Sequence, residues 1–468
     1  MKQGVNNLLL LIVSALFLII AAPSLFSDGM FSDGLLYAAL SRNMADGIGS
    51  FWTPHLSDSF FPEFYEHPPL AFGLQSLWFS LFGNSFLVER FYSLFTCALT
   101  GWVILLMWKD ITGSYLRGWI PLFFWISIPT VSWSCANNML ENNLAVFVVL
   151  AAWLYLKHWQ RNTWWLIILS GTALCLSALT KGLVGLYIWA LPFFAWLIFR
   201  QKSFGKMVLE TLLLIGLTAL PVLAFYMYSG AAAENFTFYF TKQVITGSQK
   251  VATVDSRFAI IWEFLQQTLA PLLLAIIIIG INFLRRKTET LTALKENKKM
   301  VWLFVLIVLA GVLPIMISIK QRGYYIVPVF PFFAIAMGLL IEPLLRTFFS
   351  NLKKNQLTIL HLVSALLVIA ALVIGFTQSK RIGRDQDKLS ACLKTIELTG
   401  KNRHINVVPE FYEESSYHGY FARYGNVSLF KRDSKQNNYY LTPKQQGNPP
   451  GCNSMDIGSE KYSLFFCP

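Results

Sequence analysis

The sequence predicts a polytopic α-helical membrane protein that ends in a small extracytoplasmic α/β domain. Of its 468 residues, 55% are hydrophobic and only 13% are charged, whereas soluble domains carry about 25% charged residues. The mean hydropathy is +0.51, and long apolar runs recur along most of the chain. Too few charges remain to cover a water-facing surface, so most of the surface is expected to face lipid.

The apolar runs are long enough for about 11 transmembrane helices, because a span needs about 20 apolar residues. The first run follows Lys2 and ends at Ala21-Ala22-Pro23. It resembles a signal peptide, but the many spans behind it favour an uncleaved anchor. The predicted spans are roughly 7–25, 86–107, 118–135, 141–156, 164–180, 183–199, 207–228, 262–284, 301–318, 324–345 and 358–376.

The distribution of charge predicts the orientation of these spans. The net charge of +13 does not indicate a nucleic-acid partner, because Lys and Arg form short clusters between apolar runs, as topology signals do. Loop 26–84 has six acidic residues against Arg42 alone, so it is expected outside. The positive-inside rule places four basic clusters in the cytoplasm, at 157–161, 200–206, 285–299 and 346–354.

We therefore expect a multi-pass protein of the inner (cytoplasmic) membrane, with residues 1–376 as its transmembrane domain. Residues 377–468 would form a soluble extracytoplasmic domain, in the periplasm if the cell is Gram-negative. In this tail, 385–399 and 413–424 look helical, whereas 404–408 and 427–430 look like strands. The six cysteines show no metal pattern. Cys452 and Cys467 can pair if the tail faces an oxidising compartment, although sequence alone does not establish connectivity.

Loop 26–84 is too polar to cross the membrane and too apolar to be a free linker. Its segments 34–46 and 70–83 have helical apolar spacing and are predicted to lie on the membrane surface. The chain between them is held in extended turns by several prolines. Such a loop can present carboxylates at the bilayer surface.

A series of short motifs runs in order along the chain: Ser32-Asp33-Gly34-Leu35-Leu36-Tyr37, Arg42-Asn43-Met44-Ala45-Asp46-Gly47, Trp52-Thr53-Pro54, Tyr65-Glu66-His67-Pro68-Pro69-Leu70, Phe82-Gly83-Asn84 with Glu89-Arg90, Leu179-Thr180-Lys181-Gly182, and Lys320 to Pro331. This series resembles that of PMT-like and aminoarabinose-transferase-like glycosyltransferases of the GT-C type (glycosyltransferase 39-like). Two positions differ from the family pattern, since the loop has Asp33-Gly34 where these enzymes usually have Asp-Glu, and His67 where they have Lys.

The resemblance implies a polyprenyl-phosphate sugar as donor and a carboxylate as base. Asp33 is the expected base, since a carboxylate within hydrogen-bond reach of the acceptor can take its proton. The alternative is that Asp33 merely caps a helix that begins near Gly34. Glu66 is expected to orient the acceptor. Further contacts with the substrates are expected from His67, Tyr37, Tyr65 and Tyr324.

A divalent cation bound by Glu66 and His67 is also compatible with the resemblance, with His55 as a further ligand. One Glu and one His do not define a metal site, which needs three or four ligands. No cofactor is otherwise implied. Walker A, Gly-x-Gly-x-x-Gly and His-Glu-x-x-His motifs are missing from the sequence.

Charged residues at the outer ends of spans are the remaining candidates. Glu141 begins the fourth span, where the family carries an Asp, and is expected to support Asp33 or to bind the sugar. Lys320 and Arg322 lie in a short outer loop and Lys181 at the outer end of a span, against the positive-inside rule, so we expect them to bind the donor phosphate. Snorkelling to lipid headgroups is the alternative. Weaker candidates are Lys242 and Arg257, in a loop 229–260 that is long enough to act as a lid.

The first hypothesis is an inverting glycosyltransferase that acts on the outer side of the cytoplasmic membrane. Its acceptor would be a protein hydroxyl, lipid A or another glycan of the envelope. A secondary transporter of a small or lipid-linked solute is the alternative, but the charged residues gather at span ends rather than near the midplane. A non-catalytic scaffold would leave the carboxylates without a task.

Overall fold

The computed structural model describes residues 3–247, 251–350, 354–379, 381–431, 437–446 and 449–467. Lys2 and part of the loop 229–260 lie outside these ranges. The chain divides into two compact units. The membrane unit contains Met1–Ala22, Ser93–Ala136 and Leu140–Thr377, and the loop–tail unit contains Pro23–Tyr92, Asn137–Met139 and Gln378–Pro468. The first outer loop thus clusters with the C-terminal region, which the sequence did not predict.

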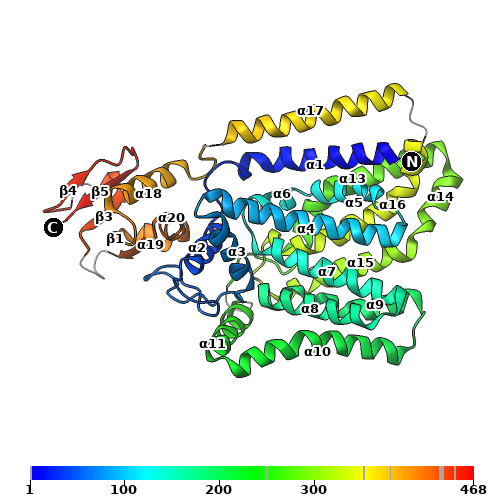
Figure 1. Ribbon diagram of the computed structural model, residues 1–468, viewed down its shortest axis with the longest axis horizontal. Helices are drawn as coiled ribbons and strands as arrows, with labels where there is room; N and C mark the ends of the chain where they lie inside the picture. Colours follow the sequence, from blue (N-terminus) through cyan, green and yellow to red (C-terminus); the bar gives the residue numbers. More distant parts are fainter. Residues whose placement is uncertain are drawn as a thin grey trace. The chain divides into compact units, whose positions relative to one another are not determined.

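The helices of the membrane unit follow the apolar runs (Figure 1). Helix α1 ends in the loop–tail unit, and helix α4 begins there. In chain order the elements are α1 (Gln3–Leu25), α4 (Phe86–Thr112), η1 (Leu116–Gly118), α5 (Trp119–Ile126), α6 (Pro129–Ala136), α7 (Leu140–Arg161), α8 (Trp164–Lys181), η2 (Gly182–Ala190), α9 (Leu191–Phe199), α10 (Phe204–Tyr228), α11 (Gly230–Phe238), η3 (Tyr239–Thr246), α13 (Ala259–Arg285), α14 (Lys287–Glu296), α15 (Lys298–Val312), η4 (Leu313–Ile317), η5 (Gly323–Val329), α16 (Phe330–Ser350) and α17 (Lys354–Gln378).

Among the described residues, nine helices are long and apolar enough to cross a membrane, or ten if the bent pair α5–α6 is one span. This count takes Trp164–Phe199 as a single helix. Both ends of that run, however, lie beside the end of α7, because Trp164 is 5.6 Å from His158 and Phe199 is 6.4 Å from Trp159 between ring centroids. The run therefore crosses and returns, and each predicted span has a helical counterpart.

Ion pairs join several of the predicted cytoplasmic loops at one end of the membrane unit. Lys157 pairs with Asp110 at 3.6 Å, and Arg117 pairs with Glu342. Arg346 lies 3.0 Å from Glu296. These contacts agree with the alternation of loops that the charge pattern predicts.

The C-terminal region of the loop–tail unit is an α/β fold, as predicted. Strands β1 and β2 and helices α18 and α20 match the predicted elements, whereas the three later strands were not predicted. The five strands follow the order β2-β1-β3-β5-β4, with β1 parallel to β2 and β3 and the other pairs antiparallel. The elements are α18 (Gln386–Thr399), β1 (His404–Val407), α19 (Pro409–Glu413), α20 (Ser415–Gly425), β2 (Ser428–Lys431), β3 (Tyr439–Pro443), η6 (Lys444–Gln446), β4 (Asn453–Met455) and β5 (Tyr462–Phe466).

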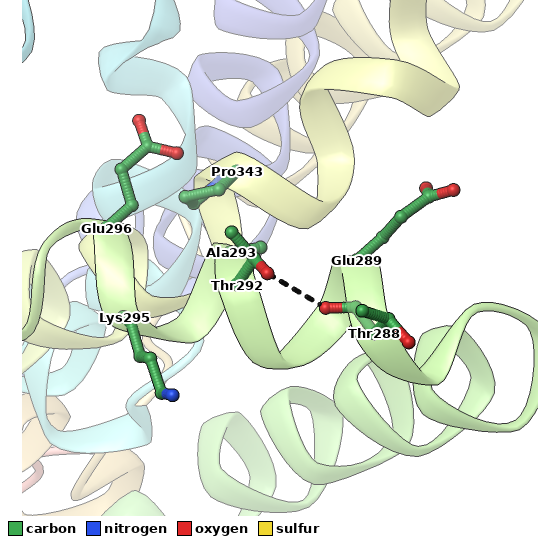
Figure 2. A pocket seen from close by; sticks show the side chains of 7 residues that line it. All are labelled: Thr288, Glu289, Thr292, Ala293, Lys295, Glu296 and Pro343. Atoms are coloured by element: carbon green, nitrogen blue, oxygen red, sulfur yellow. Dashed lines mark hydrogen bonds between the residues drawn. The ribbon is translucent and has the colours of Figure 1, made fainter.

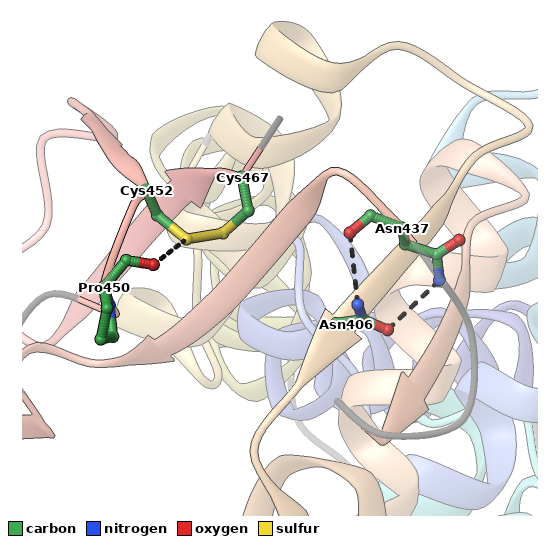
Figure 3. Close-up of a disulfide and its surroundings, with 5 residues drawn as sticks. All are labelled: Asn406, Asn437, Pro450, Cys452 and Cys467. Atoms are coloured by element: carbon green, nitrogen blue, oxygen red, sulfur yellow. Dashed lines mark hydrogen bonds between the residues drawn. A yellow bond between two sulfur atoms is a disulfide. The ribbon is translucent and has the colours of Figure 1, made fainter.

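A disulfide joins Cys452 to Cys467, which confirms the pairing that the sequence allowed (Figure 3). It connects the start of β4 to the end of β5. Nearby, the side-chain amide of Asn406 donates to the carbonyl of Asn437, and the amide of Asn437 donates back to Asn406 Oδ1 at 3.2 Å. The disulfide thus secures the edge strand β4 to β5, and the Asn406–Asn437 bonds link the interior strand β1 to the start of β3.

The first loop forms two helices, α2 (Ser32–Ala45) and α3 (Leu70–Phe82). Helix α3 leaves apolar side chains such as Leu77, Leu81 and Phe82 exposed, as a helix that lies against lipid would. Helix α2 differs from the expected surface helix, because every residue from 34 to 43 is buried. A helix that is buried on all sides presents no face to a membrane. Helix α20 of the C-terminal region covers part of α2, as described below.

Candidate active site

Asp33 lies in the first turn of α2 and is half-buried. The helix begins at Ser32, and Phe31 occupies the N-cap without a side-chain hydrogen bond. Asp33 is therefore not the N-cap, which corrects the alternative role considered for it. A carboxylate in the first turn still interacts favourably with the helix dipole. Its position leaves the carboxylate at the end of a buried helix.

Gly34 explains one departure from the family motif. A Cβ atom at Gly34 would collide with the carbonyl oxygen of Asn137. The side-chain amide of Asn138 also donates to the Gly34 carbonyl at 3.1 Å, and the backbone N–H of Phe31 donates to Asn137 Oδ1 at 2.9 Å. The segment 137–139 thus approaches α2 too closely for the Glu that the family usually has after its Asp.

Helices α2 and α3 are further joined by a buried chain of polar side chains. Ser41 Oγ donates to Gln75 Oε1 at 2.9 Å, and Gln75 Nε2 donates to Asn138 Oδ1 at 2.7 Å. Buried polar side chains of this kind are stable only when paired. Neither Asn138 nor Gln75 was singled out from the sequence, and the apolar spacing of α3 conceals Gln75.

The Tyr65-Glu66-His67 element places aromatic rings around α2. His67 lies 6.0 Å from Tyr37 between ring centroids, and Tyr37 lies 5.6 Å from Phe72. Tyr65 is buried and its hydroxyl donates to Glu63 Oε2 at 3.2 Å, whereas Glu66 and His67 are half-buried. The predicted substrate-binding residues Tyr37 and His67 therefore belong to one ring cluster, and half-exposed His67 is at its edge.

The described residues do not support a metal site at this element. No group of three or more His, Cys, Asp or Glu side chains in the described ranges is placed to hold a metal ion. His55 instead bonds the Pro62 carbonyl through Nδ1 at 2.9 Å and faces Asp58. Within the described part of the chain, no third His, Cys, Asp or Glu side chain joins Glu66 and His67, although a metal site needs three or four ligands. No chemical step of the proposed function uses a cation of this kind.

Glu141 and Lys181 form an ion pair inside the membrane unit. Glu141 lies in the first turn of α7 with no exposed surface, and Lys181 ends α8 with 5% of its surface exposed. The Lys181 ammonium also lies 5.0 Å from the centre of the Tyr325 ring and 5.9 Å from that of Tyr324. Burial excludes the snorkelling alternative for Lys181. The ion pair also brings together Glu141 and Lys181, two residues that were predicted for the site separately.

Tyr239 fixes the turn that follows Lys181. Its hydroxyl donates to the Lys181 carbonyl at 3.2 Å and accepts from the Leu183 N–H at 3.3 Å. Gly182 has φ of +63°, and a Cβ there would collide with the Tyr239 ring. Burial raises the pKa of Tyr239 to about 12, so its hydroxyl keeps the proton that it donates. Tyr239 was not among the residues predicted for the site.

Lys320 and Arg322 flank the buried Gln321 in the connection between η4 and η5. Lys320 Nζ donates to the neutral Gln243 Oε1 at 2.7 Å, and Arg322 is exposed. Of the weaker candidates, Arg257 donates to the Ile317 carbonyl and Lys242 is exposed. Among the described residues, the Lys320 ammonium bonds an amide oxygen and no carboxylate, which suits a cation that must receive an anionic ligand.

One hollow of about 600 Å³ lies at α14, lined by Thr288, Glu289, Thr292, Ala293, Lys295, Glu296 and Pro343 (Figure 2). Within it, Thr292 Oγ1 donates to the Thr288 carbonyl at 3.0 Å. None of the predicted site residues lines this hollow. It occurs in a predicted cytoplasmic loop, so we do not assign the chemistry to it.

Comparisons with known proteins bear on both units. Residues 66–225 match a family model described as dolichyl-phosphate-mannose-protein mannosyltransferase. No curated protein sequence matches the chain. The fold is similar to that of ArnT from Cupriavidus metallidurans bound to undecaprenyl phosphate, with a TM-score of 0.69 and 14% identity, over 97% of each chain.

Two archaeal structures are also similar. The oligosaccharyltransferase of Archaeoglobus fulgidus in its apo form has a TM-score of 0.56 and 13% identity, over 92% of this chain and 65% of that one. The Archaeoglobus fulgidus oligosaccharyltransferase AglB, in complex with an inhibitory peptide and a dolichol-phosphate, has a TM-score of 0.52 and 14% identity, over 93% of this chain and 69% of that one.

These matches confirm the predicted GT-C type of fold and the resemblance to PMT-like and aminoarabinose-transferase-like proteins. The family match includes Glu66, His67, Glu141 and Lys181 but neither Asp33 nor the Lys320–Arg322 loop. The roles of individual residues are therefore argued from their geometry.

Proposed function

We propose that this chain is an inverting glycosyltransferase that moves a sugar from a polyprenyl-phosphate donor to an acceptor of the cell envelope. The observation that carries the proposal is the fold, which is similar over 97% of the chain to a protein bound to undecaprenyl phosphate. The family match over 66–225 supports a sugar carried on a polyprenyl phosphate. We do not propose the transporter alternative, since no specific observation favours it.

In the proposed step, Asp33 accepts the proton of an acceptor hydroxyl. The freed oxygen attacks the anomeric carbon of the sugar from the face opposite the phosphate, and the bond between that carbon and the phosphate oxygen breaks. The electron pair leaves with the polyprenyl phosphate, which gains a negative charge. A general base of this kind accelerates transfer by about 10²–10⁴-fold, and cations on the leaving phosphate lower the barrier further.

Lys320 and Arg322 are proposed to receive the phosphate. Lys181 is less suited to this than the sequence suggested, because its charge is already neutralised by Glu141. We propose instead that the Glu141–Lys181 pair orders the outer ends of α7 and α8. The acceptor is proposed to be a protein hydroxyl, a lipid A group or another envelope glycan.

Replacing both Lys320 and Arg322 with Gln is expected to weaken donor binding by at least about tenfold, since a hydrogen bond to a charged group contributes about 1.5–3 kcal/mol. Gln243→Glu should act in the same direction, because it gives Lys320 a counter-ion that competes with phosphate. Binding of undecaprenyl phosphate to the purified protein in nanodiscs measures the effect. Lys295→Gln with Lys298→Gln, on and beside α14, is the matched control and should leave affinity unchanged. Unaltered affinity in the Lys320 and Arg322 variant would point to snorkelling.

The site is proposed to lie on the periplasmic side of the inner membrane. The disulfide between Cys452 and Cys467 supports this, because disulfides persist in oxidising compartments. Cysteines introduced at the exposed positions Ser50 and Lys401 should react in intact cells with a maleimide that does not cross the inner membrane. A cysteine at exposed Lys295 should react only after permeabilisation. The four free native cysteines are buried and give a low background. Protection of position 50 or 401 would break the proposed topology.

A further inference from the structure

Helix α20 of the C-terminal region packs directly along α2, the helix that carries Asp33 (Figure 1). The contact is close at Gly419, where a Cβ atom would come within 2.8 Å of Leu35 Cδ2. Gly419 and Leu35 are both buried. Leu35 follows Asp33 by two residues, so any displacement of α20 acts on the turn that presents the carboxylate.

Hydrogen bonds tie both ends of α2 to α20. Before the helix, the Met30 N–H donates to the Tyr420 hydroxyl at 3.3 Å. In its last turn, Arg42 Nη2 donates to the Ala422 carbonyl. The Tyr420 hydroxyl in turn donates to Asp385 Oδ2 at 2.9 Å, just ahead of α18. Helix α2 is thus held at its start and at its end by one helix that lies almost 400 positions later in the sequence.

Arg423 anchors α20 to the first turn of α4 and to the connection that precedes it. Its Nε donates to Glu89 Oε1 at 3.0 Å and its Nη2 to Glu89 Oε2 at 2.9 Å. Its Nη1 donates to Asn84 Oδ1 at 2.6 Å. Arg423 and Glu89 are each 1% exposed. A two-point contact of this kind fixes direction as well as distance, because the planar guanidinium matches the carboxylate.

Helix α2 depends on its packing partners for its position, and α20 is one of them beside α3 and the segment 137–139. It is 14 residues long and its N-cap makes no side-chain hydrogen bond. Helices of this length are marginal alone and depend on packing. A displacement of about 1 Å in a catalytic group can cost about 10²-fold in rate.

We propose that α20 is the scaffold that orients the Asp33 carboxylate, with Arg423 as a positioning residue for the transfer step. The C-terminal region then helps to hold α2, and with it Asp33, in position. This inference rests on the proposed function for the role of Asp33. The packing of α20 against α2 does not depend on the proposed function, and it can be measured without an assay of sugar transfer.

The test uses the full-length protein in nanodiscs and compares Arg423→Lys with the parent. Lysine keeps the charge opposite Glu89 but loses the two-point contact. We expect kcat to fall at least about tenfold with donor KM changed less than about twofold, because orientation acts on the reacting step and not on uniform binding. Hydrogen exchange of backbone amides in 32–45 should accelerate, whereas exchange in α7 and α8 should not. Arg403→Lys, the same substitution at an exposed arginine, is the control.

Tyr420→Phe is the second variant and keeps the proposal testable if Arg423→Lys does not fold. It removes only the hydroxyl that bonds Met30 and Asp385, and we expect the same pattern with a smaller effect. Unchanged exchange in 32–45 for both variants would overturn the scaffold, whatever the activity. Faster exchange with an unchanged kcat would overturn the positioning role. A parent protein that transfers no sugar would refute the proposed function alone and leave the exchange result standing.

Discussion

Asp33→Asn is expected to abolish sugar transfer, with kcat lower by about 10²–10⁴-fold, the usual contribution of a general base. Asparagine has the same size and keeps the first turn of α2 intact, but its amide cannot accept the acceptor's proton. Losing one charge at the helix start costs only about 0.3–1 kcal/mol. The chain should therefore still insert and fold. Initial rates with a polyprenyl-phosphate sugar measure the loss of transfer, and thermal unfolding of the purified variant measures its stability.

Glu410→Gln is the matched control, because Glu410 also lies in the first turn of a helix, α19, and is exposed. It should retain activity. Glu66→Gln tests Glu66, the other carboxylate of loop 26–84 that was expected to take part in the reaction. If Asp33→Asn were active and Glu66→Gln inactive, the base would be Glu66, and the proposed role of α20 in orienting Asp33 would lose its basis.

The spans and the type of fold were predictable because they depend on local signals. Apolar runs, basic clusters and the turn residues around Gly182 are each readable within a short window of sequence. The strands β3, β4 and β5 were missed because neither Tyr439–Pro443 nor Tyr462–Phe466 alternates regularly between apolar and polar side chains, and Asn453–Met455 is only three residues long.

The candidate site was predictable only in its residue types. Glu141 and Lys181 were each singled out, but their pairing depends on how α7 and α8 pack. Arg423 was not noticed, since a basic residue in a polar tail looks like ordinary surface charge, and only its distant partner Glu89 makes it a buried anchor. The burial of α2 has the same origin. Contacts between positions far apart in sequence leave no local pattern to read.

Lys181→Met is expected to destabilise the protein by about 3–5 kcal/mol, the usual cost of leaving a buried charge without its partner. Glu141 has no exposed surface, and methionine, although similar in size to lysine, cannot compensate its charge. Glu141→Gln should be less damaging, because the Lys181 ammonium keeps the rings of Tyr324 and Tyr325 beside it. Thermal unfolding in nanodiscs, followed by tryptophan fluorescence, measures the difference.

The double variant Lys181→Met, Glu141→Leu separates stability from function. Replacing both members of a buried ion pair with apolar residues is often neutral or stabilising, so most of the lost stability should return. Lys394→Met, which breaks the exposed pair with Glu397, is the control and should change nothing measurable. If the double variant regained both stability and transfer, the pair would be purely structural. Restored stability without transfer would show that the charges themselves are needed at the outer ends of α7 and α8, beyond holding the two helices together.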